Sequence, residues 1–209
     1  MNCKIFGFVG VESYDLAFYS AKTAMGLGRK SLILDLTGDR NVACIFHGPV
    51  ESGDVVNVSG IDIAVGKLEK GLFNGYDYIF IVMDYHLQIL DLCDEIYFFT
   101  TFQKNHVNQL KKISVPDVPR FLVLRDRAAV AMNHKGILQD LKHLDIVDDD
   151  IFDIEDTDYD IEAKVLLHYS TKVKVARLSQ SMFAFVKHLF DTDASNKEIT
   201  NAWKLMQKG

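Results

Sequence analysis

The sequence predicts a doubly wound α/β fold, in which helices flank a mostly parallel β-sheet. Apolar segments of strand length recur along the chain, and several are continuous runs rather than alternations of apolar and polar residues. Continuous runs are typical of strands that are buried on both faces of a parallel sheet. Segments with helical spacing of apolar residues lie between many of these runs, and this alternation favours right-handed crossover connections.

Six apolar segments are the expected strands. They lie at residues 3–9, 30–36, 60–66, 76–83, 94–101 and 119–125. The first contains the run IFGFV and the fourth the run YIFIVM, and neither run contains a charged residue. Because ligands of such sheets bind at the carboxyl ends of the strands, a functional site is expected where these segments end.

Six other segments have the apolar spacing of helices. Residues 15–27 place Leu16, Ala17 and Ala24 on one face, and Gly28 follows as a residue that can end the helix. The remaining expected helices lie at 103–113, 133–144, 160–169, 179–190 and 196–207.

The length of 209 residues fits one domain. We assign residues 1–193 to this domain and residues 194–209 to a short C-terminal amphipathic helix. No segment approaches the ~20 apolar residues of a membrane span, and no signal peptide is expected. The three cysteines are scattered in or beside apolar runs, which favours buried thiols in a reducing compartment. We therefore expect a cytoplasmic protein, with recruitment to the inner face of the membrane as an alternative.

The net charge of −6 comes from one segment of the chain. Residues 145–162 hold ten acidic residues and no Lys or Arg, whereas the rest of the chain carries 19 acidic and 23 basic residues. This balance does not favour a nucleic-acid partner. The segment lacks the glycine and the spacing of an EF-hand loop. Apolar residues interleave with the acids, so we expect a short strand or turn with a solvated face; docking of a basic partner is the alternative.

The C-terminal helix places Ile199, Ala202, Trp203 and Met206 on one face. Few of these side chains are large, and anchoring to a bilayer surface depends on buried apolar area together with charge. We therefore expect 196–207 to pack on the body of the protein itself. Contact with a partner and contact with a membrane remain alternatives.

The segment GFVGVESYD, residues 7–15, lies where a phosphate-binding loop would lie, between a strand and an amphipathic helix. Such a loop presents backbone N–H groups at a helix N-terminus, and glycines allow the ligand to approach them closely. A lysine contacts the terminal phosphates, and a following Ser or Thr hydroxyl helps to hold Mg²⁺. This segment has the expected position but contains no lysine.

Over nearly its whole length the chain resembles the MinD/ParA family of deviant P-loop ATPases. GRKSLILDLTGD at 28–39 is similar to the second strand of that family, and YDYIFIV at 76–82 to the third. CDEIYFFTT at 93–101 and FLVLRD at 121–126 are similar to the two strands that follow. LSQSMFAFVKHL at 178–189 is similar to the closing helix of the family. The resemblance implies the P-loop ATPase type of doubly wound sheet.

The resemblance also implies how the family motif K-G-G-x-G-K-T aligns with the first loop. The signature lysine falls on Phe8 and the phosphate-binding lysine on Ser13. The hydroxyl that would bind Mg²⁺ falls on the phenol of Tyr14, and Gly10 is the single motif glycine that remains. Glu12 adds a negative charge where phosphates would lie.

Three further family positions can be compared in the same way. The third-strand Asp of the family falls on Val82, with Asp84 two residues later, and the base-recognising Asn falls on Arg125. Asp35 is the polar site residue that matches the family. The resemblance therefore implies a degenerate site whose ligand-binding positions are Gly10, Ser13, Tyr14 and Asp35, and whose lining residues are Glu12, Asp84 and Arg125.

The missing lysine, magnesium ligands and base contact argue against ATP hydrolysis, because phosphoryl transfer depends on that charge and that metal. We expect no catalytic residue, no metal site and no cofactor. The resemblance implies a scaffold or localisation factor that acts through protein partners, with a homodimer expected. The chain is similar to the atypical TadZ/CpaE-like members of the family, which accompany pilus-assembly and secretion systems. One alternative is an unorthodox dimerisation switch that binds ATP or ADP weakly; another is a site for a different small anion, with Arg125 as its positive group.

Overall fold

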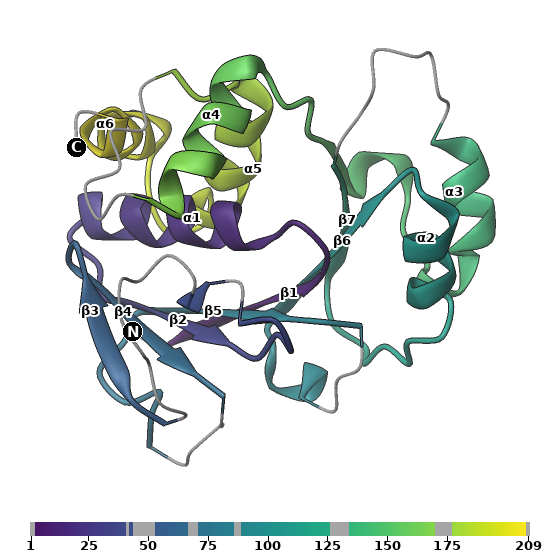
Figure 1. Cartoon of the computed structure of the whole chain (residues 1–209), viewed down its shortest axis with the longest axis horizontal. Coiled ribbons are helices and arrows are strands. Elements are labelled where there is room, and N and C mark those ends of the chain that lie inside the picture. The colour runs from purple at the N-terminus through teal and green to yellow at the C-terminus, as the bar shows by residue number, and fades with distance from the viewer. Residues whose placement is uncertain are drawn as a thin grey trace.

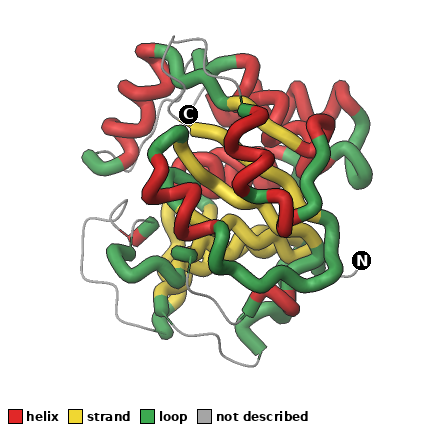
Figure 2. Tube along the Cα trace, turned by 90° about the vertical axis from the view of Figure 1, so that its right-hand side faces the viewer, coloured by secondary structure: helices red, strands yellow, loops and turns green. Residues whose placement is uncertain are grey.

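A computed structural model describes residues 3–40, 42–43, 53–66, 71–85, 89–125, 134–169 and 177–207. Within these residues the chain forms one eight-stranded sheet with the order β3-β4-β2-β5-β1-β6-β7-β8. Strands occupy the middle of the molecule, with helices on either side (Figure 2). The doubly wound α/β fold predicted from the sequence is confirmed.

The strands follow the predicted order with two additions. Their bounds are β1 Lys4–Gly10, β2 Ser31–Asp35, β3 Val55–Val58, β4 Ile61–Val65, β5 Tyr78–Met83, β6 Glu95–Thr101, β7 Arg120–Arg125 and β8 Ile151–Asp153. All neighbouring pairs are parallel except β3 and β4, which are antiparallel. β1 lies in the centre, between β5 and β6. Every residue of β2 and β5 is buried, which explains why their sequences are continuously apolar.

Two groups of helices cover the two faces of the sheet. On one face lie α1 (Tyr14–Gly26), α4 (Asp158–Leu167), α5 (Gln180–Phe190) and α6 (Asn196–Gln207). On the other lie α2 (Lys104–Leu110) and α3 (Lys135–Asp140), together with the short 3₁₀ helices Leu90–Leu92 and Lys142–Leu144. A further 3₁₀ turn, Asp148–Asp150, precedes β8. Figure 1 shows the first group together above β1 and the second group beside β6 and β7.

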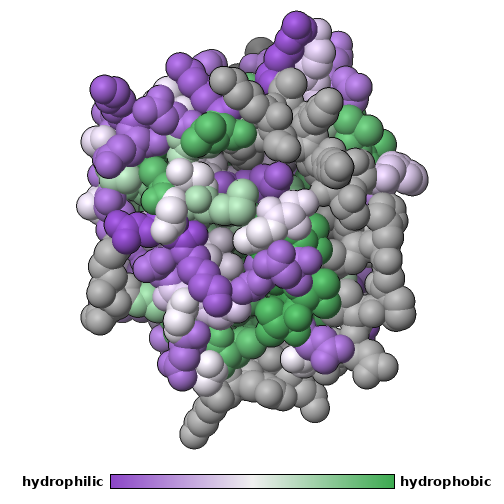
Figure 3. Space-filling model, turned by 90° about the vertical axis from the view of Figure 1, so that its left-hand side faces the viewer, coloured by the Kyte–Doolittle hydropathy of each residue, from purple (hydrophilic) through white to green (hydrophobic). Residues whose placement is uncertain are grey.

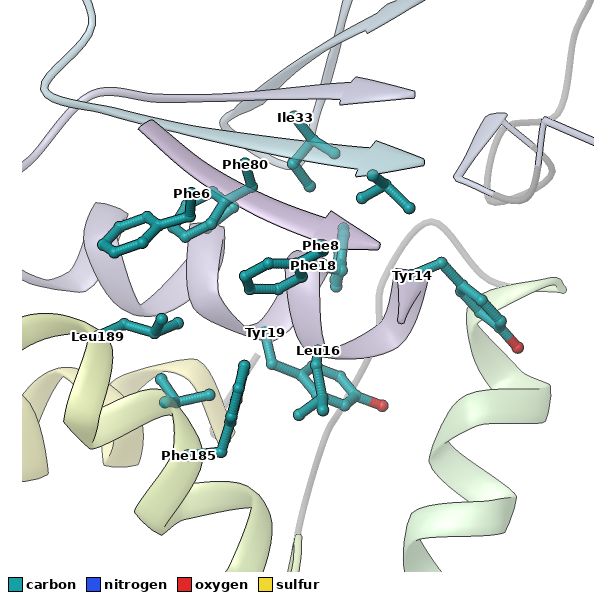
Figure 4. Packing of buried hydrophobic residues seen from close by; sticks show 14 of the residues in the cluster. Phe6, Phe8, Tyr14, Leu16, Phe18, Tyr19, Ile33, Phe80, Phe185 and Leu189 are labelled. Atoms are coloured by element: carbon teal, nitrogen blue, oxygen red, sulfur yellow. The ribbon is translucent and has the colours of Figure 1, made fainter. Parts of the chain in front are cut away.

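The core beneath the first group of helices is rich in aromatic side chains. Phe8 on β1 lies 5.9 Å from Phe80 on β5 and 5.7 Å from Phe185 on α5, measured between ring centroids. Both pairs have an edge-to-face geometry, which aromatic rings prefer. Figure 4 shows these rings between the sheet and the helices. This packing holds α5 against β1 near the carboxyl end of the strand, where the functional site is expected.

The two additional strands have different signals in the sequence. β8 is the short strand expected within the acidic segment. β3 is not predicted, because VVNV is only four residues long. It pairs with β4 through a hairpin turn in which Ser59 and Gly60 both have positive φ angles, 51° and 87°. A type I′ turn requires two positive φ angles. The Ser-Gly pair is therefore the signal in the sequence from which this hairpin could have been predicted.

The C-terminal helix α6 packs on the body of the protein. Ile199, Ala202 and Trp203 are buried, and the Trp203 ring lies 5.4 Å from Phe183 on α5. A Cβ added to Gly26, at the end of α1, would lie 3.0 Å from the Cβ of Ala202. The side chain of Met206, the fourth residue of the expected apolar face, lies outside the described residues.

None of the helices in the described part of the chain combines the length and the hydropathy that a membrane crossing requires.

Candidate functional site

The candidate site is the turn from β1 to α1, residues 10–14. Gly10 has a φ of +118°, and a Cβ added there would lie 2.1 Å from the carbonyl oxygen of Phe99. Only glycine fits this position, because any side chain would be both strained and in collision with the neighbouring strand. Glu12 also has a positive φ, 58°, which is uncommon for a residue with a side chain. The turn is therefore a tight loop with two positive φ angles, and Gly10 is its one glycine.

Glu12 and Lys164 tie this loop to α4. Their side chains form an ion pair, with 37% of the Glu12 side chain and 18% of the Lys164 side chain exposed. The ammonium group also lies 6.0 Å from the centroid of the Tyr14 ring. A lysine thus does approach the loop, but it comes from a distant part of the chain and is paired with a carboxylate of the loop itself.

Tyr14, the first residue of α1, also contacts α4. Its hydroxyl lies 3.0 Å from Nε2 of His168, and the two rings are 5.3 Å apart in an edge-to-face arrangement. Figure 4 shows the Tyr14 ring directed away from the sheet and toward α4. Burial raises the pKa of the Tyr14 phenol, so the group stays neutral. Ser13, which precedes it, is buried, and among the described residues its hydroxyl does not cap α1.

Arg125, the last residue of β7, is fully buried beneath the start of α1. Its guanidinium donates two parallel hydrogen bonds, of 3.0 and 2.9 Å, to the two carboxylate oxygens of Asp15. It donates two longer ones, of 3.2 and 3.3 Å, to Asp156. Burial alone would lower the pKa of Arg125, but the two carboxylates hold it above its ordinary value. The two-pronged geometry uses the fixed fork of arginine, which lysine cannot reproduce.

The family resemblance places Arg125 among the residues that line the site, and one alternative uses it as the positive group for an anion. In the structure this charge faces inward and is shared by two carboxylates of the chain itself. The physical reason is that the first turn of α1 contains Asp15, a buried acid that requires a partner. Burial also raises the pKa of Asp156, against the lowering effect of Arg125.

Asp35 and Asp84 hold the segment that follows β2. The carboxylate of Asp35 is buried and accepts hydrogen bonds from Thr37 N, Thr37 Oγ1, Val42 N and Ala43 N at 3.0, 2.6, 2.7 and 3.0 Å. Asp84 Oδ2 accepts one from Gly38 N at 2.7 Å. Both acids lie at the carboxyl ends of their strands, as expected. Both accept hydrogen bonds from backbone N–H groups of the segment that follows β2.

The structure therefore brings the predicted residues to one edge of the sheet but engages them with other parts of the protein. Gly10, Glu12, Ser13 and Tyr14 lie in one turn, whereas Arg125 lies beneath it. Four partners are missing from the sequence analysis, namely Asp15, Asp156, Lys164 and His168. The signal that could have found two of them is the four-residue spacing of Lys164 and His168, which places both on one side of a helix.

A separate pocket of about 240 Å³ lies at the other end of α1. Leu27, Arg29, Tyr78, Asp193 and Glu198 are among the residues that line it, and the Tyr78 hydroxyl donates a 3.0 Å hydrogen bond to Asp193. Hydrophilic and hydrophobic residues are mixed on the side of the molecule that faces the viewer in Figure 3. The pocket is smaller than the 300–1,000 Å³ of typical ligand sites. It is also remote from the turn at residues 10–14, because Tyr78 begins its strand whereas Gly10 ends one.

Comparison with known proteins shows the fold of this chain. No protein-family model matches the sequence, and no curated protein matches it. The structure is similar to that of a ParA family ATPase from Chlorobium tepidum TLS, with a TM-score of 0.57 and 14% sequence identity over 98% of this chain and 97% of the other. The chain has a ParA-like α/β fold. At this identity the likeness is one of fold alone, and it extends over both chains almost completely.

Proposed function

We propose that this protein is a ParA-like scaffold or localisation factor that acts through protein contacts rather than through ATP hydrolysis. The observation that carries the proposal is that the turn at residues 10–14 and the start of α1 are bonded to the protein's own side chains. Glu12 pairs with Lys164, Tyr14 contacts His168, and Asp15 pairs with Arg125. The charged groups Glu12 and Asp15 therefore already have partners within the chain.

Charge supports this proposal. A nucleoside triphosphate would bring several negative charges to a loop that contains Glu12, and the lysine beside it is already paired. Freeing the Arg125 guanidinium would leave Asp15 as a buried, unpaired carboxylate. Breaking such a pair costs about 3–5 kcal/mol. Nucleotide binding at this site would have to exceed that cost before it produced measurable affinity.

The partners follow from the resemblance to the atypical localisation members of the family. We propose that the protein forms a homodimer without nucleotide and contacts protein components of a cell-envelope, pilus or secretion machine. A ParA-like fold on which ATP no longer acts would keep the docking surfaces and lose the switch. The site then contributes rigidity to the start of α1 rather than chemistry.

Calorimetric titration with MgATP and with MgADP tests the proposal, with molecular mass followed by light scattering in the same buffer. We expect no heat of binding and an unchanged mass. A dissociation constant below about 100 µM together with a change of mass would show a nucleotide-dependent switch instead.

One observation favours that alternative switch: the Lys164 ammonium does lie at the loop, where a rotation of Glu12 would expose it to a ligand. If nucleotide binds, Lys164→Met should abolish the heat of binding. Lys187→Met, which removes a lysine paired with Asp191 on α5, is the matched control and should leave it unchanged.

A further inference from the structure

The surface of α4 that points away from the protein is unusually apolar. Ile161, Val165, Leu166 and Tyr169 are 52%, 51%, 40% and 75% exposed, and we call these four residues the outer α4 face. Ile161 and Val165 lie four residues apart on one side of α4, and Tyr169 follows four residues later, just past the end of the helix. With Tyr159, they make up half of the ten large apolar side chains that are exposed in the described part of the chain. Single exposed apolar residues are ordinary, but a contiguous group marks an interaction site.

The fold does not depend on the outer α4 face. The opposite side of the helix supplies the packing, where Asp160, Ala163 and Leu167 are 1%, 5% and 0% exposed. The helix also begins with a capping box between Thr157 and Asp160, and the second oxygen of Asp160 accepts a 2.9 Å hydrogen bond from Ser179 N. α4 is therefore held in place from one side, and none of the described residues buries the outer α4 face.

Acidic residues lie beside and among the residues of the outer α4 face, because Asp158 and Glu162 precede Leu166 at intervals of four residues. Glu155, Asp158 and Glu162 are exposed in or just before α4, within the segment that holds ten acidic residues. Lys164 is the single Lys or Arg between residues 145 and 169, and it is paired with Glu12. Arg177 lies at one margin, over the ring of Tyr159 at 5.3 Å. Among the described residues, the exposed charges beside the outer α4 face are therefore mainly negative.

We infer that the outer α4 face binds a partner segment in which Lys or Arg residues flank apolar ones, such as a basic amphipathic helix. Apolar side chains would cover Ile161, Val165 and Tyr169, and the basic residues would face Asp158 and Glu162. A symmetric contact between two copies of this chain would instead bring the same acids together, because a two-fold interface pairs each patch with itself. Charge therefore favours a basic partner over a second copy. The inference rests on α4 alone and holds whether or not the loop binds nucleotide.

Fluorescence anisotropy of a labelled probe peptide tests the inference with the intact protein. The probe is an amphipathic peptide of leucine and lysine, about 18 residues long, which is five helical turns. A second probe replaces every lysine by glutamate. We expect the lysine probe to bind, with an affinity that falls as salt is added, and the glutamate probe not to bind.

Two variants locate the binding. Ile161→Ser with Val165→Ser should weaken the lysine probe by at least about tenfold. Leu92→Ser, at a residue 42% exposed beside Leu90 on the other face of the sheet, is the matched control and should leave binding unchanged. Asp158→Lys with Glu162→Lys should weaken the lysine probe and allow the glutamate probe to bind. The charge variant keeps the test decisive if the serine variant unfolds, which thermal melting would reveal.

Three results would overturn the inference. The first is a lysine probe that does not bind. The second is equal weakening in the serine variant and in the Leu92→Ser control, which would mean that binding is not located on α4. The third is a dimer by light scattering that the charge variant makes tighter, because the occupant of the outer α4 face would then be a second copy. None of these results bears on MgATP binding, so they are distinct from a failure of the proposed function.

Discussion

Two ionic contacts hold the region where β1 turns into α1, and they differ in their surroundings. The pair of Arg125 with Asp15 is fully buried, whereas that of Lys164 with Glu12 is partly open to water. Both bring opposite charges together near the turn at residues 10–14. Burial determines how much the loss of each pair lowers the free energy of unfolding. A buried charge that loses its partner cannot be solvated, but a partly exposed one recovers its hydration.

The comparison separates two roles that the sequence alone does not distinguish. The buried pair is part of the core, since it joins the end of β7 to the first turn of α1. The exposed pair only connects the loop to α4. We therefore expect that the fold requires the contact of Asp15 with Arg125 and that it can lose the contact of Glu12 with Lys164.

The largest effect is expected from breaking the buried pair. Arg125→Met leaves the Asp15 carboxylate buried without its cation and should lower the free energy of unfolding by about 3–5 kcal/mol. Urea denaturation measures the change. The double variant Asp15→Leu, Arg125→Met is the control, because removing both charges should recover much of the loss. A single variant as stable as the original protein would show that this pair is not structural.

A smaller loss is expected from a change in the backbone of the loop. Gly10→Ala combines a φ of +118° with a Cβ placed 2.1 Å from Phe99 O, and it should cost about 3 kcal/mol. Gly28→Ala is the matched control, because its φ is +72° but nothing lies within 4 Å of the added atom. The control should lose only about 1–2 kcal/mol. Equal losses in urea denaturation would mean that the contact with Phe99 relaxes freely.

The local backbone of the site follows from the sequence, but the long-range contacts of its side chains do not. The strands that carry Gly10 and Asp35 are predicted to within one residue at each end, because continuous apolar runs predict the local backbone. The partner of Arg125 is not predictable in this way, because Asp15 lies 110 residues away along the chain. The Tyr14–His168 contact spans 154 residues. Such pairs depend on how α4 and β7 are placed around α1, which local patterns do not specify.

A neutral contact of the same region gives a pH-dependent effect. Burial raises the pKa of Tyr85 to about 12, and its hydroxyl donates a 3.1 Å hydrogen bond to Phe99 O beside Gly10. Because the folded pKa lies above the unfolded value near 10, the stability from this neutral phenol is complete below pH 10 and is lost as the pH rises through 12. Tyr85→Phe cannot ionise and lacks this loss. Between pH 9 and pH 12 the variant should gain about 2 kcal/mol relative to the original protein.

Chemical denaturation of both proteins across this pH range measures the gain. Other buried tyrosines destabilise both proteins equally, so the difference between the two isolates Tyr85. Tyr159→Phe is the control, because its hydroxyl lies at the surface and accepts a hydrogen bond from Arg177. A difference between Tyr85→Phe and the original protein that stays constant with pH would contradict the raised pKa.

The smallest effect is expected from the exposed pair. Lys164→Met keeps most of the packing of the lysine stem and removes the charge, while Glu12, with 37% of its side chain exposed, remains hydrated. Partly exposed ion pairs contribute about 0–1 kcal/mol, and added salt reduces the contribution further. The free energy of unfolding should therefore change by less than about 1 kcal/mol at low salt and by still less at high salt. A loss as large as that of Arg125→Met would show that both contacts belong to the core, and that the loop is held to α4 as firmly as α1 is held to β7.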